Sequence, residues 1–253
     1  MEEIRLLDRL RHAIRVRQYS MATEKAYVTW IRRFILFHLK RHPAEMGKDE
    51  VEAFLTHLAV NRSVSPSTQN QALQAILFLY RQVLQTELPW MDDVVRAKPK
   101  VRIPVVLSVA ETRALLDNSE AFLRLPISLL YGSGLRVAEC LRLRVGDIDF
   151  HRHTIRVHAG KGGKDRATVL PRNLEDELAS QISSIRQIHQ HDLTMGLGKA
   201  KLPPALQRKL GKSSQRFHWQ FIFPSSRVSP DPREPSARYR WHIHAGIKGA
   251  GYN

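Results

Sequence analysis

Residues 129–150 read LLYGSGLRVAECLRLRVGDIDF, and this stretch organises the second half of the chain. Two glycines end an apolar helical segment that we expect over residues 121–131. Arg136 then begins a helix that we expect to reach about residue 144, with Glu139 one turn further on. We expect the inner face of this helix to carry Val137, Cys140 and Leu141. An arginine at such a position can grip a phosphate with two parallel hydrogen bonds, although an exposed arginine is the commoner finding.

The hydrophobic periodicity then changes from helical to alternating. Apolar residues recur at every second position in three short runs: Ile148 and Phe150, Ile155 and Val157, and Ala167 and Val169. This pattern predicts a small antiparallel sheet. The sequence GKGGKDR at 160–166 joins the last two strands as a glycine-rich basic turn. Lys161 in that turn is a cation that can be inserted beside a phosphate, or simply a solvated lysine.

The first 88 residues predict a compact bundle of four helices. Ser20 and Ser65 are candidate N-caps, and Pro66 suits the first position of a helix. Apolar residues follow both caps at spacings of three and four, as on the buried face of a helix. The basic residues of this region, which include Arg32 and Arg33, are then available to a solvated face or to a polyanion.

The helical pattern breaks after Leu88. The stretch AKPKVRIP at 97–104 carries two prolines, which disfavour helix, and three basic residues, Lys98, Lys100 and Arg102. We therefore expect an extended basic linker over residues 89–106. The second domain opens with a capping box formed by Ser108 and Glu111, and a long polar helix is expected over about 174–191.

The chain of 253 residues has 40 Lys and Arg against 24 Asp and Glu, a formal net charge of +16. Such an excess favours a nucleic-acid partner over solubility alone. Because the basic residues are spread along the chain, a membrane surface is a poorer fit. A lone Cys140 excludes an intramolecular disulfide framework, and the apolar runs are too short to span a bilayer. We predict a cytoplasmic protein that binds nucleic acid.

We expect neither a cofactor nor a metal. GKGGKD lacks the first glycine and the final Ser or Thr of a nucleotide-binding loop, because His158 and Asp165 stand in those places. The histidines at 151, 153, 158, 242 and 244 are not paired with ligands at metal-binding spacing. The sequence has no RNP-type aromatic motif that would support an RNA-binding function.

Together, LLYGSGLRVAECLRLRVGDIDF and IRVHAGKGGKDRATVLP resemble the catalytic domain of tyrosine site-specific recombinases, the phage-integrase family. YSMATEKAYVTWIRRFILFH and STQNQALQAILFLYRQVL resemble its helical, SAM-like core-binding domain. HDLTMGLGKAKLPPALQRKL, followed by WQFIFPSS, is similar to the insertion of integron integrases, which we place at about 191–223.

The resemblance implies a mainly α fold with a small antiparallel sheet, two domains that clamp DNA, and a homo-tetramer on recombination sites. In this family a tyrosine attacks the scissile phosphate, and no metal or nucleotide is needed. By the match, Arg136 is the first catalytic arginine, Glu139 supports it, and Lys161 protonates the leaving group. We expect Lys164, Arg166 and Trp219 to contact DNA as well. Trp219 and Phe221, near Pro203 and Pro204, can receive an unstacked base, or can simply pack the insertion onto the domain.

The end of the sequence departs from the family pattern, which expects His-x-x-Arg and then the nucleophilic tyrosine. Residues 238–253 read RYRWHIHAGIKGAGYN, so His242 and His244 are followed three positions later by Ala245 and Ile247. We interpret residues 107–244 as a partial catalytic domain and 245–253 as an atypical tail, as a frameshift or premature stop produces. Tyr252 is then not a nucleophile. The expected outcome is a recombinase that cannot cleave and that assembles weakly; the alternative is a DNA-binding fragment.

Overall fold

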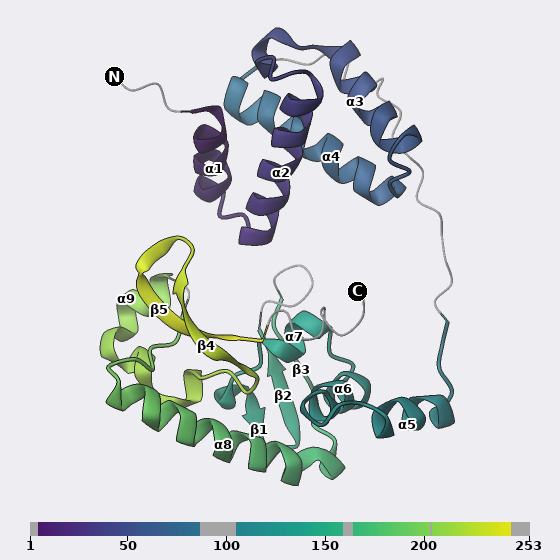
Figure 1. The fold of residues 1–253 in the computed structure, drawn as a ribbon. Coiled ribbons are helices and arrows are strands. Elements are labelled where there is room, and N and C mark those ends of the chain that lie inside the picture. Colours follow the sequence, from purple (N-terminus) through teal and green to yellow (C-terminus); the bar gives the residue numbers. More distant parts are fainter. Residues whose placement is uncertain (1–4, 87–104, 159–163, 203, 244–253) are drawn as a thin grey trace. The chain divides into compact units, whose positions relative to one another are not determined.

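The structure is a computed structural model, and it describes residues 5–86, 105–158, 164–202 and 204–243. The chain divides into two compact units, Met1–Val105 and Val106–Asn253 (Figure 1). Each unit is built around its own cluster of buried hydrophobic side chains. None of the described helices is both long enough and apolar enough to cross a lipid bilayer.

The first unit is the predicted bundle of four helices. Its helices are α1 (Leu6–Val16), α2 (Met21–Phe37), α3 (Lys48–Val60) and α4 (Pro66–Leu79), and a π turn (Tyr80–Leu84) continues α4. The predicted N-caps are confirmed, because the hydroxyls of Ser20 and Ser65 accept the amides of Thr23 and Thr68. Helix α4 packs against both α2 and α3 (Figure 1).

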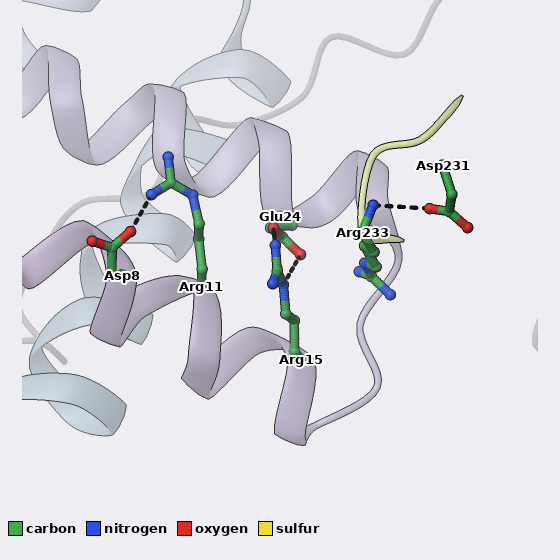
Figure 2. A network of polar contacts seen from close by, with 6 residues as sticks. All are labelled: Asp8, Arg11, Arg15, Glu24, Asp231 and Arg233. Atoms are coloured by element: carbon green, nitrogen blue, oxygen red, sulfur yellow. Dashed lines mark hydrogen bonds and ion pairs between the residues drawn. The ribbon is translucent and has the colours of Figure 1, made fainter. Parts of the chain in front are cut away.

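Polar contacts hold the helices of this bundle in place. Figure 2 shows the guanidinium of Arg15 on α1 forked onto the carboxylate of Glu24 on α2, with the shortest contact at 2.7 Å. In the core, the hydroxyl of Tyr80 donates to the carbonyls of Pro43 and Met46, at 2.9 and 3.0 Å. These bonds tie the end of α4 to the connection between α2 and α3.

The second unit combines helices with a three-stranded antiparallel sheet. Its elements are α5 (Val109–Asp117), α6 (Ala121–Ser133), α7 (Val137–Leu141), β1 (Ile148–Asp149), β2 (Thr154–Val157), β3 (Arg166–Val169) and α8 (Glu175–Thr194). The strand order is β1-β2-β3, and Ile155 pairs with Thr168. The predicted capping box of α5 is confirmed, because Ser108 and Glu111 bond each other in both directions. Leu178 on α8 belongs to the same buried cluster as Ile155.

Two predictions for this unit need correction. Helix α7 ends at Leu141 and not near residue 144, because the backbone of Leu143 turns to accept the amide of Ile222. Val137, expected inside, is 49% exposed, whereas Cys140 and Leu141 are buried as predicted. A helix of five residues has a narrower inner face than the longer helix we expected.

Strand β3 faces the opposite way from its apolar pattern. Ala167 and Val169 are exposed, and the intervening Thr168 donates its hydroxyl to the carbonyl of Ser133 at 2.7 Å. The side chains of a strand alternate between faces, and Arg166 on the same face as Thr168 bonds Glu139, so the two apolar residues face outward. The alternation predicted the strand correctly but did not predict its buried face.

A second sheet was not predicted. Residues 224–242 form a hairpin of β4 (Pro224–Asp231) and β5 (Glu234–His242), preceded by the short helix α9 (Pro204–Leu210). Figure 2 includes its turn, where the amide of Arg233 donates to Asp231 at 2.8 Å. The hairpin is fastened to α8 by a two-armed ion pair between Arg240 and Asp192, with a shortest contact of 2.6 Å. Its prolines and serines are typical of a loop, so the sequence did not predict the two strands.

Candidate functional site

The turn between α6 and α7 brings Arg136 to the surface. Gly134 ends α6 with a φ of 61°, a left-handed conformation that glycine adopts without strain. Leu135 is buried and anchors the turn, and Arg136 follows as the N-cap residue of α7. Two residues, 134 and 135, therefore join α6 to Arg136, whose side chain is more than half exposed.

Glu139 is the centre of the site. Its carboxylate accepts the backbone amide of Arg136 at 2.9 Å and the guanidinium of Arg136 at 2.7 Å. Arg166, on β3, adds two parallel hydrogen bonds to the same carboxylate, both at 2.8 Å. The Glu139 side chain is only 9% exposed, against 56% for Arg136 and 35% for Arg166. The two arginines thus cover the acid from both sides.

The electrostatics follow from this geometry. The hydrogen bonds from Arg166, joined by those from Arg136, lower the pKa of Glu139 to about 2, so it is a carboxylate at neutral pH. Two guanidinium groups share one carboxylate, which leaves a local excess of positive charge. Gly134, Arg136, Lys164, Asp165 and Arg166 line an open pocket of about 390 Å³ at this point. Such a pocket suits an anion with several oxygens, because arginine binds phosphate in a bidentate manner.

The predicted site residues fall in different parts of the structure. Arg136, Glu139, Lys164 and Arg166 come together around the pocket. Arg32 and Arg33 are exposed on α2 of the other unit, where the guanidinium of Arg33 lies 5.0 Å from the centre of the Trp30 ring. Four predicted residues lie outside the described part of the chain: Lys98, Lys100, Arg102 and Lys161.

Arg166 illustrates a role that the sequence did not indicate. We predicted it as a contact to DNA, but its guanidinium donates two hydrogen bonds to Glu139. The guanidinium of Arg136 donates one hydrogen bond to the same carboxylate. Its contact with DNA stays a prediction, while its pairing with Glu139 is a feature of the structure. The signal in the sequence was weak, since 27 residues separate the two partners.

Trp219 lies in a short 3-10 turn (Phe217–Trp219) and is half-buried. Its ring lies 4.5 Å from that of His218, and its indole N–H is buried without a hydrogen-bond partner among the described residues. Phe221, our other candidate for stacking on a base, is buried under the guanidinium of Arg144 at 4.4 Å. Phe221 therefore packs the insertion onto the domain. Trp219 fits both predictions, packing and stacking on an unstacked base.

The base of the turn that carries the predicted Lys161 has a contact that we did not anticipate. The two ring nitrogens of His158 face Asp147 at 3.3 Å and Asp165 at 2.9 Å. The sequence could have indicated this contact, because His158 and Asp165 stand at the two ends of the predicted turn. Within the described ranges, no group of three or more His, Cys, Asp or Glu side chains could hold a metal ion.

Comparison with known proteins identifies the family. Residues 6–90 match the phage integrase N-terminal SAM-like domain, and residues 105–248 match the phage integrase family. An integrase/recombinase from Escherichia coli is 45% identical over 244 residues, which cover 96% of this chain and 72% of that protein. An integrase/recombinase from Pseudomonas aeruginosa matches with the same figures.

Solved structures support the same assignment at the level of the fold. The Tn1549 transposon integrase, solved in complex with transposon right end DNA, superposes with a TM-score of 0.52. It is 16% identical, and the match covers 87% of this chain and 71% of that one. With both family models matched in order along one chain, the protein belongs to the phage integrase family of tyrosine recombinases.

Proposed function

We propose that this chain carries the DNA-binding part and some of the catalytic residues of a site-specific DNA recombinase of the integron-integrase type, a class that cleaves and rejoins DNA through a phosphotyrosine intermediate. The observation that carries the proposal is the cluster of Arg136, Glu139 and Arg166 beside a cationic pocket, in a chain that matches the phage integrase family. The net charge of +16 supports a polyanionic substrate.

The proposed chemistry assigns one role to each residue. Arg136 binds a nonbridging oxygen of the scissile phosphate and stabilises the charge that develops in the transition state. Glu139, held as a carboxylate, fixes the direction of Arg136 and does not touch the substrate. Lys161 donates a proton to the departing 5′-oxygen. Residues 1–88 act as the core-binding domain, 89–106 as a basic linker and 107–244 as part of the catalytic domain.

The same reasoning limits what a polypeptide of these 253 residues can do. The second arginine and the nucleophilic tyrosine of the family pattern are not recognisable in residues 238–253, and residues 238–242 belong to strand β5. Loss of cooperating catalytic groups costs many orders of magnitude in rate. We therefore propose that this polypeptide binds DNA but does not cleave it, and that its assembly into a tetramer is weakened.

A suicide-substrate assay separates binding from cleavage. The probes are a duplex integron attachment site, nicked to trap the covalent link, and a scrambled duplex of equal length. We expect a mobility shift that favours the attachment site and no protein-DNA band that survives denaturation. A covalent band that Tyr252→Phe abolishes would refute the inactive state, and equal affinity for both duplexes would refute site-specific recognition.

Salt dependence provides a second measurement. Much of the affinity should come from phosphate contacts, so the logarithm of the binding constant should fall steeply with the logarithm of salt concentration. An affinity that does not change with salt would contradict a DNA interface built from arginine and lysine.

The integron-type substrate is proposed from the insertion. Its segment 191–223 presents Trp219 half-buried on a short turn, and a flat aromatic ring can receive a base that has left its stack. The discriminating substrates are a folded single strand with an extrahelical base and a fully paired duplex of equal length. A preference for the folded strand that Trp219→Ala removes is the expected result.

A further inference from the structure

The side chain of Arg144 links two parts of the insertion to the segment that follows α7. One arm of its guanidinium donates to the carbonyl of Trp219, and the other donates to the carbonyl of Lys201 at 2.8 Å. The face of the guanidinium lies 4.4 Å from the centre of the Phe221 ring. Burial lowers the pKa of Arg144 from its ordinary value.

Backbone contacts on both sides of Arg144 make the same connection. The amide of Ile222 donates to the carbonyl of Leu143 at 2.9 Å, and the amide of Val145 donates to the carbonyl of Gln220 at 3.0 Å. Arg144 and Phe221 therefore pair as in an antiparallel sheet. Residues 143–145 and 220–222 thus form one short antiparallel ladder, and the guanidinium of Arg144 bonds the Trp219 turn next to it.

A glycine next to the ladder shows how close the two segments come. A Cβ added to Gly146 would lie 3.0 Å from the carbonyl oxygen of His218 and 3.2 Å from its Cβ. A Cβ this near a backbone oxygen is tighter than ordinary packing, so a larger residue at 146 would push the 3-10 turn at Val145–Asp147 and the Trp219 turn apart by a few tenths of an ångström.

The other end of the same segment carries Arg136, which with Glu139 and Arg166 forms the cluster that we propose binds phosphate and here call the phosphate-binding cluster. Arg136 lies at the start of α7, eight residues before Arg144, and Cys140 and Leu143 between them are fully buried. Asp147 accepts the amide of Arg144 at 2.8 Å, which fixes the backbone just beyond the ladder. The segment from 136 to 147 thus has Arg136 at one end and the Trp219 turn docked at the other.

We propose that Arg144 is a positioning residue that fixes the Trp219 turn relative to Arg136, so that the insertion and the phosphate-binding cluster engage one DNA in a single register. The inference rests on the proposed function, because it takes Arg136 and Trp219 as contacts to DNA. Arg144 itself touches neither base nor phosphate; it acts through the carbonyl of Trp219.

The first test measures local order in the free protein. Arg144→Met keeps the apolar part of the side chain but leaves two carbonyls without their donor, whereas Arg142→Met removes the same charge from an exposed position two residues away. Amide hydrogen exchange should accelerate at least tenfold over residues 217–222 in Arg144→Met and should stay unchanged in Arg142→Met. Unchanged exchange over 217–222 in Arg144→Met would overturn the inference.

The second test measures recognition with the same two variants. The affinity for a folded single strand with an extrahelical base is divided by the affinity for a fully paired duplex of equal length. Arg144→Met should lower this ratio at least fivefold, with the duplex affinity close to that of Arg142→Met. A variant that was merely destabilised would lose both affinities together and keep the ratio, which would refute positioning.

Two further results keep this inference separate from the proposed function. Adding Trp219→Ala to Arg144→Met should lower the ratio no further than either change alone, because both remove the same contact. Gly146→Ala should lower the ratio as well, since its methyl group would displace His218. A wild-type protein without any preference would refute the DNA role of the insertion and this inference with it. A wild-type preference that Arg144→Met retains would refute the inference alone.

Discussion

Replacing Glu139 by glutamine removes the charge that two arginines share and changes the shape of the side chain very little. The variant Glu139→Gln leaves the guanidinium groups of Arg136 and Arg166 side by side without a counterion. The amide also cannot accept four hydrogen bonds, and its NH₂ group meets donors on the arginines. We therefore expect the free energy of unfolding to fall at neutral pH.

The size of the loss follows from the pKa of Glu139, which falls from 4.5 to about 2 in the folded state. Because a tenfold change in proton affinity is worth about 1.4 kcal/mol, the full depression corresponds to about 3 kcal/mol. The arginines are partly exposed, so solvent screens the pair, and we expect a loss of about 1 to 2 kcal/mol.

The pH dependence tests the origin of this loss. A carboxylate whose pKa is lower in the folded protein stabilises it fully above its unfolded pKa, and this stabilisation disappears as the pH falls through the folded value. The difference between wild type and Glu139→Gln should therefore be largest above about pH 5 and should shrink towards about pH 2.

Urea denaturation at four pH values from about 7 down to about 2 measures the difference. Glu120→Gln is the matched control, because Glu120 is an exposed carboxylate at the start of α6, and it should change the unfolding free energy little at any pH. A difference between wild type and Glu139→Gln that stays constant from pH 7 to the acid limit would refute an electrostatic role for Glu139.

Three further substitutions test the packing of the two units. Arg240→Met leaves the 5% exposed carboxylate of Asp192 without its partner, so we expect a loss of about 3 kcal/mol and faster amide exchange throughout the β4–β5 hairpin; unchanged exchange would contradict this. Phe34→Ala empties a fully buried site in the first unit and should cost about 3 to 5 kcal/mol by urea denaturation followed through the fluorescence of Trp30, and a loss under about 1 kcal/mol would be inconsistent with a packed core. Ser108→Ala removes the cap of α5 and should lower the melting temperature through a loss of about 1 kcal/mol, with no change as the opposing result.

Local chemistry explains which elements could be predicted from the sequence. The caps at Ser20, Ser65 and Ser108 were correct, because a cap is decided by a side chain and an amide three positions away. The turn at Gly134 was also predictable, because few residues other than glycine adopt its left-handed conformation. Such signals need no knowledge of distant parts of the chain.

The two wrong predictions of secondary structure, the end of α7 and the missed β4–β5 hairpin, have their cause in long-range contacts. Helix α7 stops early because residues 143–145 pair with 220–222, about 75 residues away, and no local pattern records that partner. The β4–β5 hairpin was missed for a related reason. Its prolines and polar residues do not predict strands, and the ion pair of Arg240 with Asp192 on α8 holds it in place. Tertiary contacts override weak local preference in both places.

The candidate site contains one contact that the sequence predicts locally and one that depends on the fold. Arg136 and Glu139 are three residues apart, so the sequence alone predicts their contact once a helix begins between them. Arg166 comes from a strand, and only the fold brings it to Glu139, where it is the largest influence on the pKa of that acid. The resemblance to a family therefore pointed to Arg136, the residue that we propose binds the phosphate. The pairing of Arg166 with Glu139 and the contact of Arg144 with the Trp219 turn join residues that are far apart in the sequence, so both follow only from three-dimensional contacts.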